Sequence, residues 1–198
     1  MFEPIIDDDK YAFAFIGPHW SNFISLKQCD PEVIHHLEKA PNKQGQFDLT
    51  FTLEKELSDN APSDAYRLTI EDRTNHGASA NFLPFTSKDK NEVKQFILAI
   101  VQGLTQQQLI GVSVIDIQWA LETGGRELSL MTVEAESKLK STIYNALFVY
   151  TNNQGNLNHF EATVQRVQES LTPNATLVAM IAPVEGPADA FCLTKVDA

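Results

Sequence analysis

Only two cysteines, Cys29 and Cys192, occur in the 198 residues, and neither belongs to a CxxC or Cys/His pattern. We therefore expect reduced thiols and a core that needs no disulfide or structural metal. No apolar run approaches the roughly 20 residues that span a bilayer, so membrane insertion is not expected. The opening MFEPIIDDDKYAFAF contains neither the basic start nor the apolar core of a signal peptide. The expected location is the cytoplasm.

Positive charge is also scarce. Fifteen Lys and Arg residues stand against 26 Asp and Glu residues, which gives a formal net charge of −11 at pH 7. Such an excess opposes binding to nucleic acid phosphates and to anionic lipid. It complements a basic protein partner and slows self-association.

Motifs for common catalytic chemistry are missing. The glycines at positions 103, 111, 124 and 125 never reach the spacing of a dinucleotide loop, and neither a P-loop nor a G-x-S-x-G turn occurs. Cys29 comes just before a predicted helix start, but the neighbouring Asp30 opposes formation of its thiolate. We therefore expect no cofactor and name no catalytic residue.

Candidate metal ligands are few. His35-His36 falls on a predicted short helix, where adjacent side chains point about 100° apart and only His35 and Glu38 face each other. The run Asp7-Asp8-Asp9 and the turn at 72–77 lack the ligand spacing of a calcium loop. We interpret all of them as surface residues and expect no metal.

One carboxylate pair is a candidate for acid–base chemistry. Asp116 and Glu127 would face each other across a predicted hairpin, on the polar side of a sheet. Without a pocket around them, solvated strand residues are the preferred interpretation.

The fold class follows from hydrophobic periodicity. The strongest helical pattern covers 87–106, with a capping-box-like start at Thr86 and Asp89 and a solvent side that includes Gln95 and Gln102. Period-two alternation predicts strands at 11–15, 46–53, 66–70, 112–121, 127–135, 142–150, 157–163 and 176–181. We expect one α+β domain over residues 1–198: an antiparallel meander crossed by one long helix, with one or two shorter helices.

Three segments are harder to assign. Residues 29–88 read as an insertion-like segment, and 189–198 as a polar tail that frays. Residues 164–171 fit either a short helix or the end of a long strand. If Thr176–Ile181 is a free sheet edge, its apolar run is a candidate seam for a homodimer or a client.

The order of elements resembles the Mog1/PsbP-like fold, a group of protein-binding proteins with relatives in type VI secretion. The resemblance rests on Tyr11-x-Phe13 running into Gly17-Pro18-His19-Trp20, and on the helix at 92–104. It continues through a strand at Trp119, Gly124-Gly125, a meander at 143–163 and a closing helix at 164–171. The segment 29–88 and the strand near 176–181 depart from the group. The resemblance implies a protein that binds other proteins and catalyses nothing.

The candidate binding residues are the aromatic side chains in or near predicted loops, where large apolar groups are common in interaction surfaces. These are Trp20, Phe23, Phe82 and Phe85. The leading hypothesis is a non-enzymatic chaperone, adaptor or regulatory subunit that captures a segment of another protein at a groove or sheet edge. One alternative is a small hydrolase or ligand-binding enzyme with His76 or His159 in a loop-built site. Another is an immunity protein that neutralises a toxin.

Overall fold

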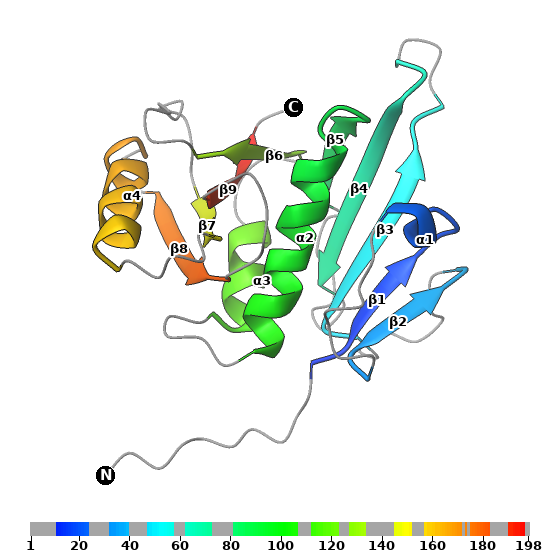
Figure 1. Cartoon of the computed structure of the whole chain (residues 1–198), viewed down its shortest axis with the longest axis horizontal. Coiled ribbons are helices and arrows are strands. Elements are labelled where there is room, and N and C mark those ends of the chain that lie inside the picture. Colours follow the sequence, from blue (N-terminus) through cyan, green and yellow to red (C-terminus); the bar gives the residue numbers. More distant parts are fainter. Residues whose placement is uncertain are drawn as a thin grey trace.

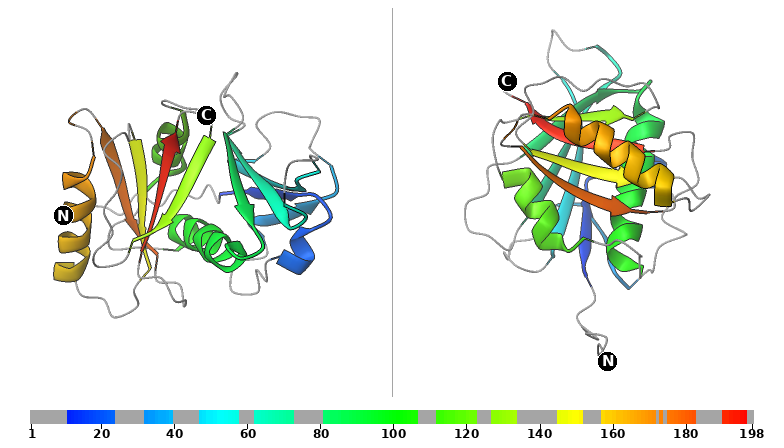
Figure 2. Two further views of the ribbon diagram at one scale, coloured as in Figure 1. Left: turned by 90° about the horizontal axis from the view of Figure 1, so that it is seen from above. Right: turned by 90° about the vertical axis from the view of Figure 1, so that its left-hand side faces the viewer.

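The chain forms a mixed β-sheet with helices on both faces (Figures 1 and 2). This computed structural model describes residues 11–23, 32–39, 47–57, 62–72, 81–106, 112–122, 127–133, 145–151, 157–171, 173, 175–182 and 190–196. The strands are β1 (Phe13–Ile16), β2 (Ile34–Leu37), β3 (Leu49–Lys55), β4 (Ala65–Asp72), β5 (Asn81–Thr86), β6 (Glu127–Thr132), β7 (Asn145–Tyr150), β8 (Thr176–Ile181) and β9 (Ala190–Val196). The helices are α1 (Trp20–Phe23), α2 (Lys90–Thr105), α3 (Val114–Glu122) and α4 (Leu157–Glu169).

The sheet order in the described residues is β2-β1-β3-β4-β5-β6-β9-β7-β8. Four neighbouring pairs are parallel (β1–β2, β1–β3, β5–β6 and β7–β8), and the other four are antiparallel. The expected antiparallel meander is therefore wrong, although the mixture of helices with one large sheet is confirmed. Alternation reveals a half-buried strand, but it says nothing about the direction of the neighbouring strand.

The sheet curves around α2 and α3, whereas α4 covers the opposite face near β7 and β8 (Figure 2). The main core joins the inward faces of both halves of the sheet to these two helices. Its fully buried members include Phe13, Phe51, Phe96, Leu147 and Phe191. A second core lies beneath α4 and includes Phe148, Phe160 and Val167.

Helix α2 lies within the predicted range but is buried on almost every side. Gln95 and Gln102, expected on a solvent face, are only 5% and 6% exposed. Neither amide atom of Gln95 has a hydrogen-bond partner, an arrangement that costs about 1–3 kcal/mol. Helix α2 has 16 residues, α4 has 13 and α3 has 9. The expectation of one long helix with one or two much shorter ones is therefore wrong.

Helix α3 replaces the strand predicted at 112–121. The Ser113 hydroxyl and backbone N–H both donate to Asp116 Oδ2, at 2.7 and 2.8 Å, and the Asp116 N–H returns a bond to the Ser113 hydroxyl at 3.3 Å. This reciprocal capping box starts the helix despite its β-branched residues. As a result Ile115 and Trp119 lie on the exposed side of α3, at 73% and 39% exposure, and Ile117 is buried.

Helix α4 replaces the strand predicted at 157–163 and continues through most of the ambiguous segment after it. Phe160, Thr163 and Val167 are buried at helical spacing, with Val164 and Leu171 packed beside them. The strand at Trp119 and part of the meander, which carry the likeness to the Mog1/PsbP-like fold, are thus helices.

The predicted strands are confirmed at β1, β3, β4, β6, β7 and β8. The insertion-like interpretation of 29–88 is wrong, because this segment supplies β2 to β5 and β3 pairs directly with β1.

The prediction that residues 189–198 form a fraying tail is also wrong. Strand β9 lies between β6 and β7, and Phe191 and Cys192 are fully buried. Strand β8 pairs with β7 and stands at the end of the sheet order.

A variant that ends at residue 189 should therefore lose cooperative folding. Burial of a large apolar side chain contributes about 1.5–3 kcal/mol, so the loss of Phe191 and Leu193 alone approaches the total stability of a typical domain, about 5–15 kcal/mol. Urea unfolding followed by circular dichroism measures the effect. A variant that lacks only residues 197 and 198 is the control and should unfold as the full chain does. A sharp transition in the shorter variant would contradict the central placement of β9.

Candidate functional site

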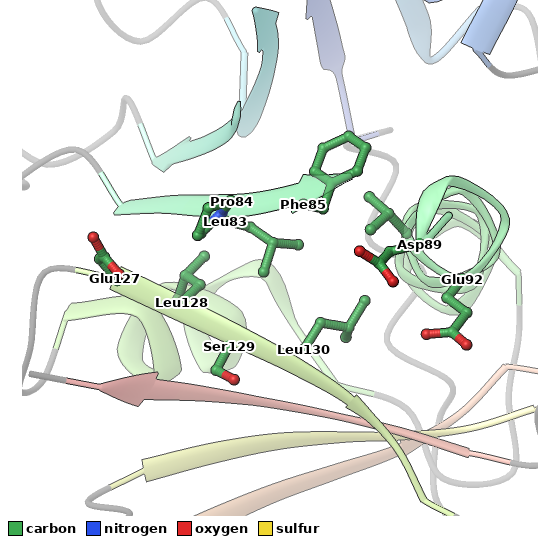
Figure 3. A pocket seen from close by; sticks show the side chains of 10 residues that line it. Leu83, Pro84, Phe85, Asp89, Glu92, Glu127, Leu128, Ser129 and Leu130 are labelled. Atoms are coloured by element: carbon green, nitrogen blue, oxygen red, sulfur yellow. The ribbon is translucent and has the colours of Figure 1, made fainter. Parts of the chain in front are cut away.

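The sheet is interrupted between β5 and β6. These parallel neighbours share one register pair, Phe82 with Glu127, and separate beyond it (Figure 3). Within β5, Pro84 has no N–H with which to continue a ladder, and proline in sheets is confined to edges, strand starts and bulges. Because β5 has no residue after Phe82 in register with β6, it behaves on that side as an edge strand within the sheet.

The separation of the two strands creates a cavity of about 370 Å³, which we call the wedge. Apolar side chains from both strands and from the first turn of α2 line it together with the polar side chains of Asp89, Glu92, Glu127 and Ser129, and polar atoms make up the larger share of its surface (Figure 3). The apolar residues are Leu83, Phe85, Val93, Leu128 and Leu130.

A second cavity of about 470 Å³, which we call the shelf, adjoins the wedge along β5. The two cavities share Pro84, Phe85, Asp89 and Glu127, so they lie next to each other, and we call the pair the groove. The remaining residues that line the shelf are Glu56, Pro62, Ala65, Tyr66, Arg67, Phe82 and Thr86.

Arg67 fixes the floor of the shelf. Its guanidinium carbon lies 4.4 Å from the centre of the Phe82 ring, and its Nε lies 3.3 Å from Glu56 Oε2. The Nη2 group donates to Glu56 Oε1, also at 3.3 Å. Since the Arg67 side chain is 40% exposed, the cation–π contact contributes about 0.5–1 kcal/mol and the ion pair no more than about 1 kcal/mol.

The start of α2 positions the acidic rim of the groove. The Thr86 N–H and hydroxyl both donate to Asp89 Oδ2, at 3.1 and 2.9 Å. The Ser87 hydroxyl donates to Asp64 Oδ2 at 2.7 Å, which ties the β5–α2 junction to the turn before β4. The predicted pairing of Thr86 with Asp89 is thus present, although the helix begins at Lys90.

The groove is negative overall. Glu56 is matched by Arg67, whereas Glu92 and Glu127 have no cationic partner among the residues that the structure describes. Lysines 88, 90 and 94 follow on the same turns but line neither cavity. One of them, Lys90, lies over the Phe23 ring, with its Nζ 5.3 Å from the ring centre.

The four predicted binding residues divide into two groups. Trp20, Phe23 and Phe85 are buried, at 1%, 3% and 6% exposure, and stack edge to face in a row. Trp20 and Phe23 lie on the short helix α1, and Phe85 lies on β5. Phe82 is half-buried on the shelf, and Phe85 lines both cavities. Trp20 and Phe23 therefore support the groove from behind instead of presenting a surface.

The other candidates do not converge on the groove. His35 and His36 lie on β2, so the predicted helix is wrong and the two side chains point to opposite faces of the sheet. Asp116 caps α3 and does not pair with Glu127. In the described ranges, no group of three His, Cys, Asp or Glu residues is arranged to hold a metal ion.

His159 lies on α4, where its Nδ1 is 2.7 Å from the Tyr150 hydroxyl, and it lines neither cavity. Asp7-Asp8-Asp9, Cys29 and His76 lie outside the described residues, as does all but the first residue of the turn at 72–77. No helix in the described ranges combines the length and apolarity needed to cross a membrane.

Sequence reasoning missed the wedge itself. It named none of Glu92, Leu128 and Leu130 as a binding residue. One signal was available: Pro84 inside the run at 82–85 marks a strand with one side unable to pair. The partner strand β6 begins about 40 residues later, and no local pattern indicates that the two meet.

Comparison with known proteins adds little. Neither a protein-family model nor a curated protein matches the chain. A solved structure of an empty FtsZ dimer from M. jannaschii matches 54% of this chain with 15% identity and a TM-score of 0.40. The match spans 36% of that protein's length. A likeness of this size supports no conclusion about fold or function.

Cys192 is the one free cysteine among the described residues. Burial raises the pKa of its thiol from 9.0 to about 12. Because the thiolate is the reactive species, this cysteine is unsuited to nucleophilic chemistry.

In a Cys29→Ser background, Cys192 should resist the thiol reagent DTNB at pH 8 and react only as fast as the chain unfolds. Above pH 9 the unfolded chain releases the thiol proton and the folded chain keeps it, so stability should fall between pH 9 and about 12. Absorbance at fixed times measures the labelling, and the urea-unfolded chain is the control. Labelling of the folded chain at the rate of a free peptide thiol would contradict the burial.

Proposed function

We propose that this chain is a protein-binding module that captures an extended segment of a partner in the groove between β5 and β6. The observation that carries the proposal is the interruption of the sheet: two adjacent strands meet at one residue pair and then separate around a cavity. An extended peptide binds such an edge through backbone hydrogen bonds and places alternate side chains in neighbouring pockets.

The shape of the groove favours a segment over a compact small molecule. The shelf and the wedge follow one another along β5 and share Pro84 and Phe85. The shelf offers aromatic and proline surfaces to one side chain, and the wedge offers a half-open space lined by leucines and carboxylates to another. Beyond Phe82 and Glu127, β5 and β6 have no further residue pair in register, so their facing backbone groups are suited to pairing with a guest strand.

The charge of the whole chain supports the same role. A net charge of −11 steers a basic partner towards the molecule and discourages wrong partners and self-association. An adaptor, a chaperone for a secreted client and a regulatory subunit all use this kind of recognition, and an immunity protein differs from them only in its partner. Of the two histidines of the hydrolase alternative, His159 lies away from both cavities and His76 lies outside the described residues.

A substitution that fills the wedge with a larger side chain of the protein itself should weaken the binding of a peptide segment. Peptides of about ten residues would be selected from a random displayed library on the full chain, and their affinity measured by calorimetry. Leu130→Trp places a larger side chain in the wedge, and we expect it to weaken binding at least about tenfold, the equivalent of about 1.4 kcal/mol.

Leu177→Trp is the matched control, since Leu177 is also a half-buried leucine but lies on β8. It should leave affinity within about twofold, and thermal unfolding should show that both variants fold. Selected peptides that bind the two variants equally well would contradict the groove as their site.

A further inference from the structure

The wedge differs in chemistry from the shelf beside it, and this difference bears on which side chain it accepts. Its interior is lined by Leu83, Leu128 and Leu130, which point into the space between the two strands (Figure 3). Its mouth holds the carboxylates of Asp89 and Glu92 at the start of α2. A cavity lined by both leucine side chains and carboxylates matches a side chain that has an aliphatic stem and a cationic end.

We propose that the wedge holds the side chain of an arginine or lysine from the partner's segment. This inference rests on the proposed function and names the chemistry of its anchor. The aliphatic stem packs on the leucines from β5 and β6, and the charged head group remains at the mouth, between Asp89 and Glu92. The wedge, at about 370 Å³, falls at the small end of ligand cavities, which span roughly 300–1,000 Å³. That volume is large enough to admit one long side chain.

Charge separates this occupant from the other candidates. Glu92 and Glu127 have no cationic partner in the described part of the chain, and the second oxygen of Asp89 receives no described hydrogen bond. An acidic side chain would meet like charges at the mouth. A neutral apolar side chain would desolvate these carboxylates without compensation, whereas a cation pairs with them.

The shelf is the weaker of the two sites for a cation, although it shares Asp89 and Glu127 with the wedge. Arg67 already covers the Phe82 ring and pairs with Glu56, so the shelf has its own positive charge. A basic side chain placed there would meet Arg67. The segment is therefore oriented, with its basic residue in the wedge and an apolar residue on the shelf.

Side-chain analogues test the anchor without knowledge of the partner. The probes are n-butylguanidinium, n-pentylammonium and the neutral 1-pentanol, titrated into the full chain with methyl-labelled leucine and valine. We expect both cations to shift the methyl signals of Leu83, Leu128 and Leu130, and to bind at least about fivefold more tightly than 1-pentanol in 0.1 M salt. This preference should shrink in 1 M salt, where the screening length falls from about 10 to about 3 Å.

Glu92→Gln should weaken binding of both cations about two- to fivefold, the range of exposed ion pairs, and leave 1-pentanol unaffected. Glu161→Gln is the matched control, because Glu161 is an exposed carboxylate on α4 away from the groove. Glu161→Gln should change the affinity neither for the two cations nor for 1-pentanol. Equal binding of 1-pentanol and the cations, or equal effects of the two substitutions, would overturn the proposal.

The two proposals fail in different ways. Library peptides that bind the groove but contain no enriched Arg or Lys, and that n-butylguanidinium does not displace, would overturn the cationic anchor and leave segment capture standing. Cations that bind in the wedge while no peptide can be selected would overturn segment capture. Enriched basic peptides displaced by n-butylguanidinium support both.

Discussion

The burial of α2 is the constraint on which the remaining structure depends. Eleven of its 16 residues are buried, so the helix must be enclosed on opposite sides. The curved sheet provides this enclosure, and one half of it approaches closely enough that a Cβ at Gly103 would collide with the side chain of Met180 on β8. The strands nearest the start of α2, β5 and β6, are the two that separate, and the groove lies where the enclosure is least complete.

Local pattern was sufficient to predict most of the strands and α2, because alternation and the 3.6-residue period report which face of an element is buried. It failed at α3, where Ile115, Ile117 and Trp119 alternate like a strand but the Ser113–Asp116 capping box starts a helix. It failed again at β9, where a fraying tail was expected although Phe191 and Cys192 are fully buried and the strand lies between β6 and β7. Strand direction and sheet order depend on contacts between distant segments, so the mixed topology was beyond local reasoning.

The candidate site was predicted only in part. Aromatic residues near 82–85 and an acidic surface pointed to segment capture, and Phe82 and Phe85 do line the groove. Trp20 and Phe23 instead fill the core behind it. Aromatic side chains are used both for packing and for binding, so the residue type alone does not tell which role applies. The wedge needs β5, β6 and α2 together, and only Pro84 signals locally that a ladder ends there.

Hydrogen–deuterium exchange of the full chain, with and without a selected peptide, tests the central claim most directly. If a segment pairs with the separated strands, the amides of β5 and β6 gain protection on binding, whereas those of β1 and β2 keep their exchange rates. Protection confined to β8, the far end of the sheet, would place the binding site at that edge. That result would contradict the account.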